Sequence, residues 1–188
     1  MRSRLFLERT TVTGPESHHV LNMLTAHELI GFMSPKLSAE ILEHAFSSDK
    51  ELYKATLAAV AQARKVRPVF LERQPRAERH VTMLSTLSRP GLEPAAGGLL
   101  RGWLLKKHTA LLTDFLDALG VPHKDGVVDD LPETMDDAKL RSAVETVLAK
   151  HPAEVVMVYL HAFYEMNEAR WPNLKAMLET EPRLQFGG

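Results

Sequence analysis

The chain contains no cysteine among its 188 residues. This absence excludes disulfides, thiolate zinc sites and cysteine nucleophiles. No apolar run approaches the ~18 residues that a membrane-spanning helix needs. Leu5 to Leu7 is also too short to form the apolar core of a signal peptide before Glu8. These absences predict a soluble, cytoplasmic protein that does not enter a membrane.

The sequence also lacks the common catalytic motifs. It has no Gly-x-Ser-x-Gly elbow, no phosphate-binding Walker loop, no dinucleotide fingerprint and no His-Glu-x-x-His helix. These absences favour a binding protein without a cofactor over an enzyme.

Helix start and stop signals recur along the whole chain, whereas strand alternation bounded by turn residues is hard to find. The signals predict an all-α fold, a compact bundle of about seven or eight helices in a single domain over residues 1–188, with an arm at about 1–13 and a frayed tail at about 181–188. Capping boxes are expected at Ser48 with Glu51 and at Thr134 with Asp137. The expected helices lie at about 15–33, 38–46, after Ser48, 75–88, 94–119, after Thr134, 152–167 and after Pro172.

The stretch from Val155 to Tyr164 has no charged residue. A helix that is apolar on every side must be buried, so the helix at about 152–167 is predicted to lie at the centre of the bundle. An offset of 103 residues also aligns Leu37 with Leu140 and Leu57 with Leu160. This spacing leaves open a duplicated helical hairpin, although two copies do not make a solenoid.

Charge is divided unevenly along the chain. Up to Ala110 there are 16 basic and 10 acidic residues, a net charge of +6, and after it there are 7 and 14, a net charge of −7. The two parts could attract each other within the molecule, pair subunits, or steer a partner to one face.

Histidine and glutamate within the apolar helix offer a possible metal site. His161 and Glu165 are four residues apart, so they share one helical face. With His108, which lies on the apolar stripe of the longest expected helix, they could bind one divalent metal ion. A structural histidine whose ring bonds to Glu165 or to a backbone carbonyl is the competing interpretation.

The longest expected loop is rich in metal-ligand and turn residues. Its candidate ligands do not match the spacing of a calcium-binding loop, and Asp125-Gly126 predicts a small hairpin or compact turn. A solvated acidic loop is the simpler interpretation. The candidates are His123, Asp125, Asp129, Asp130 and Glu133.

A basic stretch with a local charge of +4 runs from Arg64 to His80. Its guanidinium groups could contact phosphate, nucleic acid or an acidic protein, or they could be solvated or paired within the molecule. Phe70 is the only aromatic residue there, which disfavours single-strand binding by base stacking. The candidate contacts are Arg64, Lys65, Arg67, Arg73, Arg76 and Arg79.

Together these features predict a binding module that acts through protein partners or self-association. A metal-binding protein or metal-assisted enzyme is the first alternative. Nucleic-acid binding is the second, and the sequence pI of about 6.8 disfavours it.

Overall fold

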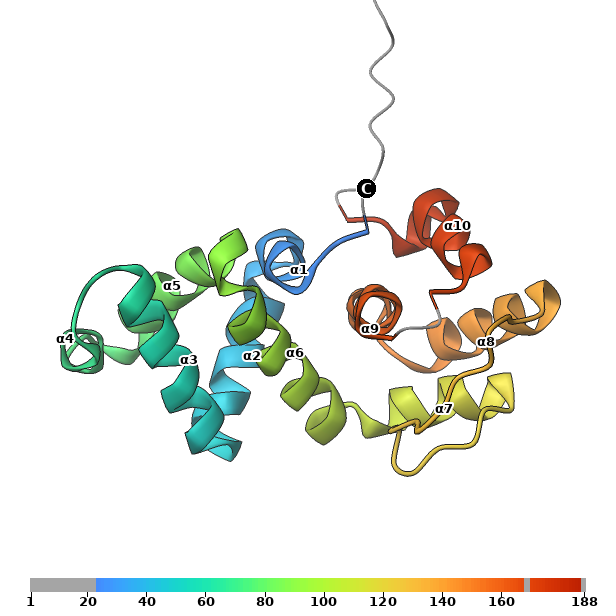
Figure 1. Cartoon of the computed structure of the whole chain (residues 1–188), viewed down its shortest axis with the longest axis horizontal. Coiled ribbons are helices and arrows are strands. Elements are labelled where there is room, and N and C mark those ends of the chain that lie inside the picture. The colour runs from blue at the N-terminus through green and yellow to red at the C-terminus, as the bar shows by residue number, and fades with distance from the viewer. Residues whose placement is uncertain (1–22, 168–169, 187–188) are drawn as a thin grey trace, which may run out of the picture.

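The computed structural model describes residues 23–167 and 170–186, so the expected arm at 1–13 and the start of the first expected helix lie outside the described residues. The described residues form an all-α fold, with one isolated bridge between Lys124 and Val127 (Figure 1). The elements are α1 (Ala26–Phe32), α2 (Pro35–Ser48), α3 (Lys50–Ala63), α4 (Pro68–Glu72), α5 (Arg76–Leu87), η1 (Pro90–Leu92), α6 (Glu93–Lys107), α7 (Thr109–Leu119), α8 (Asp137–Lys150), α9 (Ala153–Met166), α10 (Pro172–Thr180) and η2 (Pro182–Leu184).

The helix predicted over residues 94–119 is two helices, because the backbone of His108 leaves the helical conformation at φ −118° and ψ 28°. Its N–H donates to the Leu104 carbonyl and ends α6, while its own carbonyl accepts the first hydrogen bonds of α7. The ring packs edge-on against Trp103, with 4.3 Å between centroids. This break and the short helix α4 account for the two helices beyond the predicted eight.

Two helix caps that the sequence predicts at Ser48 and Thr134 are formed by nearby aspartates instead. Helix α2 continues through Ser48, so the Asp49 carboxylate caps α3 by accepting from the Leu52 N–H at 3.2 Å. Asp136 caps α8 in the same way, in place of Thr134. The predicted left-handed end at Gly120 is confirmed, with φ at +65°.

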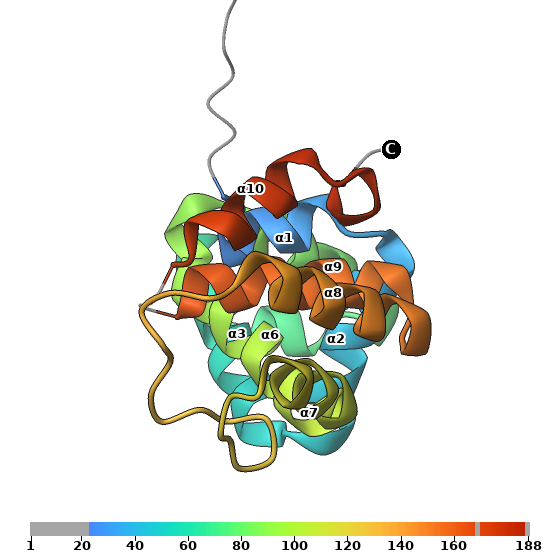
Figure 2. The same ribbon diagram turned by 90° about the vertical axis from the view of Figure 1, so that its right-hand side faces the viewer.

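Helix α9 is the predicted central helix. Its ten consecutive residues from Val155 to Tyr164 are all buried. Figure 1 shows α9 nearly end-on, and Figure 2 shows α8 and α10 lying over it. Phe115 of α7 packs edge-on against Tyr159 and Phe163, with centroid distances of 5.5 and 5.4 Å. One connected hydrophobic core includes residues from α1 through to η2.

The predicted frayed tail is wrong for its described part, residues 181–186. Glu181 caps the short helix η2, which packs against α9. Leu184 is completely buried. The tail therefore belongs to the core.

The aligned hairpins have matching lengths but different surroundings. Helices α2, α3, α8 and α9 each contain 14 residues. Helix α3 buries one face, whereas α9 is buried on all sides. No described helix is both long and apolar enough to cross a lipid bilayer.

Candidate functional site

The structure does not bring the predicted metal ligands together. His161 bonds to a backbone carbonyl, Glu165 lies 3.7 Å from the guanidinium of Arg170, and His108 packs on Trp103. Burial raises the pKa of Glu165, and Arg170 opposes that rise. Within residues 23–167 and 170–186, no group of three histidine or acidic side chains is placed to hold a metal ion.

His161 has the geometry of a structural histidine. Its Nε2 lies 3.0 Å from the Leu184 carbonyl oxygen, which can only accept, so Nε2 carries the proton. This bond fits the alternative in which a backbone carbonyl holds the ring. Nδ1 is buried without a hydrogen-bond partner among the described residues. Burial lowers the pKa of His161, because the cation would lose its hydration.

Acid should therefore destabilise the fold. Burial lowers the pKa of both His161 and His108 below the ordinary value of 6.5. As the pH falls below 6.5, these histidines therefore bind more protons in the unfolded chain than in the folded protein. We expect the free energy of unfolding in urea to be lower at about pH 5 than at about pH 7.5. The free energy of unfolding should fall less between these two pH values in His161→Gln, whose amide retains a donor for the Leu184 carbonyl. Equal declines in both proteins would contradict this role of His161.

The acidic loop forms the predicted hairpin turn rather than a ligand cluster. Lys124 and Val127 exchange two backbone hydrogen bonds around Asp125 and Gly126, both of which have positive φ. The His123 ring accepts from the Gly126 N–H and donates to Asp117. Asp129, Asp130 and Glu133 border a separate shallow hollow beside Val128 and Leu131. Hydrogen bonds within this turn therefore stabilise the start of the loop.

The six basic candidates divide into two groups. Arg76 lies 3.2 Å from a Glu43 carboxylate oxygen and over the Phe46 ring. Arg79 donates to the Tyr53 hydroxyl at 2.9 Å and to the Glu72 carbonyl at 3.0 Å. These two arginines are paired within the molecule and hold α5 against α2 and α3.

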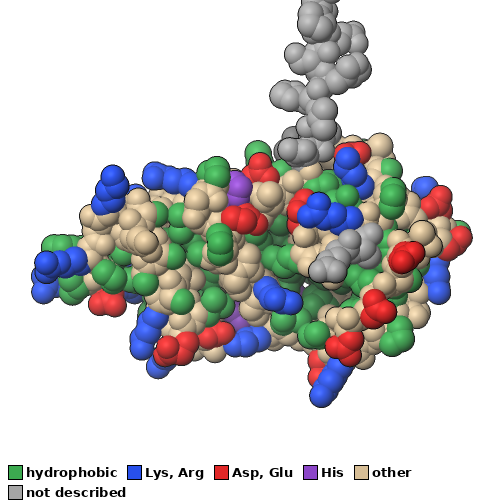
Figure 3. Space-filling model, viewed as in Figure 1, with side chains coloured by type: hydrophobic (Ala, Val, Ile, Leu, Met, Phe, Trp, Pro, Cys, Tyr) green, Lys and Arg blue, Asp and Glu red, His purple; other side chains and the backbone are tan. Residues whose placement is uncertain are grey.

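The remaining four cations point outward at one end of the molecule. Arg64 donates to the Thr86 hydroxyl at 3.3 Å, and none of the four cations Arg64, Lys65, Arg67 and Arg73 forms an ion pair with a described carboxylate. We call residues 62–73, which include these four cations and Glu72, the basic tip. Its net charge is +4 − 1 = +3. Figure 3 shows the blue cationic side chains gathered at the left end, where Figure 1 places α4.

Apolar side chains lie among these cations. Residues 62–70 are all exposed, including Val66, Val69 and Phe70, of which Phe70 is 56% exposed. Leu71 alone is buried and anchors the single turn of α4 to the core. The tip therefore exposes an apolar surface that the chain's own core leaves uncovered.

The turn at the tip contains a residue in an unfavourable conformation. Lys65 has φ at +56°, and its N–H donates to the Gln62 carbonyl while the Val66 N–H donates to that of Ala61. This hydrogen-bond pattern is a Schellman ending, in which glycine is the usual residue at the left-handed position. The chain thus has a lysine where glycine would be more stable.

The opposite charges of the two parts are not joined by direct contact. Every ion pair among the described residues joins two groups before Ala110 or two groups after it, such as Lys106 with Asp49 and Arg183 with Glu145. Direct pairing between the parts therefore does not neutralise the cations of the basic tip.

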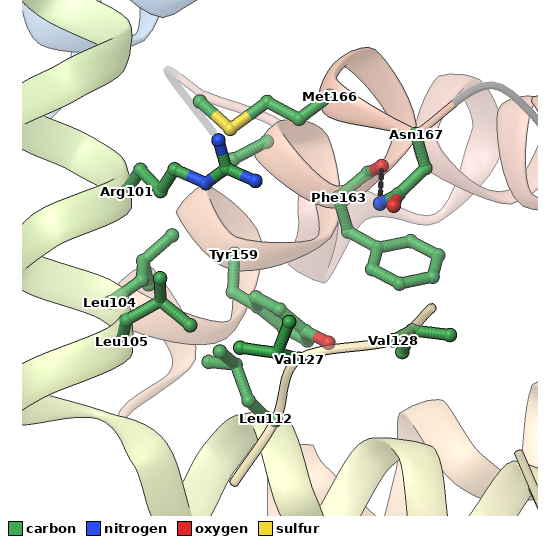
Figure 4. Close-up of a pocket in the computed structure, with 12 residues that line it drawn as sticks. Arg101, Leu104, Leu105, Leu112, Val127, Val128, Tyr159, Phe163, Met166 and Asn167 are labelled. Atoms are coloured by element: carbon green, nitrogen blue, oxygen red, sulfur yellow. Dashed lines mark hydrogen bonds between the residues drawn. The ribbon is translucent and has the colours of Figure 1, made fainter. Parts of the chain in front are cut away.

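A second candidate site is an apolar cleft between α6, α9 and the hairpin turn (Figure 4). Its polar lining residues are Arg101, Tyr159 and Asn167, and the Asn167 amide donates to the Phe163 carbonyl. None of the three was predicted as a site residue. No sequence motif marks them, because they become neighbours only when α6 packs near α9. The walls include Leu104, Leu105, Leu112, Val127, Val128 and Phe163.

Comparison of the chain with protein-family models, curated proteins and solved structures gave no match. The functional interpretation therefore rests on the chain's own residues.

Proposed function

We propose that the chain is a non-enzymatic interaction module whose basic tip binds an acidic protein segment that also carries apolar side chains. The observation that carries this proposal is the exposed run 62–70, where the apolar side chains of Val66, Val69 and Phe70 lie beside three cations that have no carboxylate partner among the described residues. Protein interfaces combine an apolar centre with a polar rim, and complementary charge speeds association.

The composition of the tip favours a protein over a nucleic acid. A nucleic-acid surface needs cations along the phosphates, and a single-strand binder also needs several aromatic rings for stacking. The tip has one exposed ring, Phe70, beside two valines. The lack of cysteine suits a reducing cytoplasm, where we propose that the module acts.

Calorimetric titration with a synthetic helical peptide rich in glutamate and leucine tests the proposal. We expect saturable binding that weakens with salt. The peptide affinity should fall about tenfold or more in Val69→Ser/Phe70→Ser, because apolar anchors dominate interface energies. Arg67→Glu/Arg73→Glu should also weaken binding and remove most of its salt dependence.

Arg141→Glu is the matched control, because Arg141 is an exposed arginine of α8, and α8 packs on α7 and α9 rather than beside the tip. It should leave the affinity unchanged. Two results would each overturn the proposal: equal weakening by Arg141→Glu, or tighter binding of a single-stranded oligonucleotide than of the peptide.

Lys65→Gly should separate stability from binding. Glycine adopts the left-handed conformation without the side-chain clash, so the free energy of unfolding should rise by about 0.5–1 kcal/mol. Peptide affinity should fall, because one cation of the tip is lost. Urea unfolding and the same calorimetric titration measure the two effects, and a variant that is both less stable and unchanged in binding would contradict this role of Lys65.

A further inference from the structure

The cleft between α6 and α9 combines apolar walls with the polar side chains of Arg101, Tyr159 and Asn167. Its volume of about 120 Å³ is close to that needed by one small ring, since an apolar cavity of ~150 Å³ holds benzene. Leucine side chains of α6 and α7 form one wall, and Val127 and Val128 of the hairpin turn form another. Figure 4 shows these side chains directed into the same space.

Tyr159 lines this cleft, and its hydroxyl oxygen lies toward Val128 (Figure 4). The residue is only 4% exposed, and its hydroxyl forms no hydrogen bond with the other residues that line the cleft. Burial raises the pKa of Tyr159, so the phenol remains a neutral donor.

Arg101 provides the cation of the cleft. It is an exposed residue of α6, and it forms no ion pair with a described carboxylate. Figure 4 places its guanidinium beside Met166, away from the Tyr159 oxygen near Val128. A guanidinium recognises a carboxylate through two parallel hydrogen bonds.

We propose that this cleft binds a small aromatic carboxylate with a hydroxyl on the far side of its ring. The carboxylate would pair with Arg101, the ring would lie between the leucine and valine walls, and the hydroxyl oxygen would accept from Tyr159. This site is independent of the basic tip, since none of its residues belongs to 62–73.

The hairpin turn gives the cleft a fixed wall. Gly126 has φ at +81°, and a Cβ atom there would lie 2.6 Å from the Leu112 Cβ. Glycine thus lets the turn pack directly on α7 and holds Val127 at the cleft. A wall fixed in advance reduces the conformational entropy that binding would cost.

Titration of the full chain with 4-hydroxybenzoate, followed by amide chemical shifts, tests the site. We expect saturable shifts at Val127, Val128 and Phe163. Benzoate, which lacks the hydroxyl, should bind several-fold more weakly, and 4-hydroxybenzyl alcohol, which lacks the carboxylate, at least about tenfold more weakly, as expected for the loss of a charge-assisted pair.

Two variants assign the polar contacts. Arg101→Gln should lower the affinity for both carboxylates, whereas Tyr159→Phe should lower that for 4-hydroxybenzoate and leave benzoate unchanged. Both variants retain the fold-forming parts of their side chains, and Arg89→Gln is the matched control that should change neither affinity. No saturable shift at about 10 mM ligand, or an affinity unaffected by Arg101→Gln, would overturn the proposal, because a specific carboxylate site requires this charge-assisted pair.

Discussion

Removing residues 181–188 should lower the free energy of unfolding by about 3–5 kcal/mol. Leu184 is fully buried, and the loss of such a side chain from a core removes about 2–5 kcal/mol. Truncation also leaves the Nε2 donor of His161 without its carbonyl acceptor, which adds the cost of an unsatisfied buried group. Urea unfolding of the full and truncated chains measures the difference.

Two adjacent substitutions in the full chain control for the truncation. Leu184→Ala should reproduce most of the loss, about 2–4 kcal/mol, because it leaves a cavity against α9. Arg183→Ala should have a much smaller effect, since its ion pairs with Glu145 and Glu181 lie at the surface. Similar losses in both variants would contradict the packing of η2.

Gly126→Ala should destabilise the fold by roughly 3 kcal/mol. The positive φ of +81° is unfavourable for alanine, and the added Cβ would overlap the Leu112 side chain at 2.6 Å. Because Gly126 shapes a wall of the cleft, the substitution should also weaken the binding of 4-hydroxybenzoate. Urea unfolding and the shift titration measure these two effects.

Gly91→Ala is the matched control, because a Cβ at Gly91 would have no neighbour within 4 Å. Its free energy of unfolding should change little. A loss as large as that of Gly126→Ala would mean that any glycine substitution destabilises the chain. A neutral Gly126→Ala would show that the turn can move away from α7.

The sequence predicts the fold class and the central helix because both depend on local patterns. Nine apolar residues and one histidine in succession, with no charge among them, require burial wherever the helix lies, and Gly120 ends α7 through its own conformation. The break at His108 was missed because it depends on packing against Trp103, without proline or glycine to mark it. The position of Leu184 in the core was missed because Leu184 lies beyond the last predicted helix, in a short segment without a helical period of its own.

The candidate sites were predictable only in part. The basic tip follows from the sequence, but which arginines turn inward does not, since Arg76 and Arg79 find Glu43 and Tyr53 through tertiary packing. The spacing of His161 and Glu165 suggested a pair, whereas the ring bonds to a carbonyl 23 residues further along the chain. Arg101 and Tyr159 are far apart in sequence, so no local motif could have indicated the cleft.

Mapping where the glutamate-and-leucine peptide binds tests the central claim that the exposed basic tip is a docking surface. The measurement is a titration of the ¹⁵N-labelled full chain, followed by backbone amide shifts at low and at moderate salt. We expect the largest saturable shifts within residues 62–73, reduced at the higher salt, with the cleft residues unaffected. Saturable shifts centred elsewhere, or no shifts in the tip at a peptide concentration that saturates the calorimetric signal, would contradict the assignment.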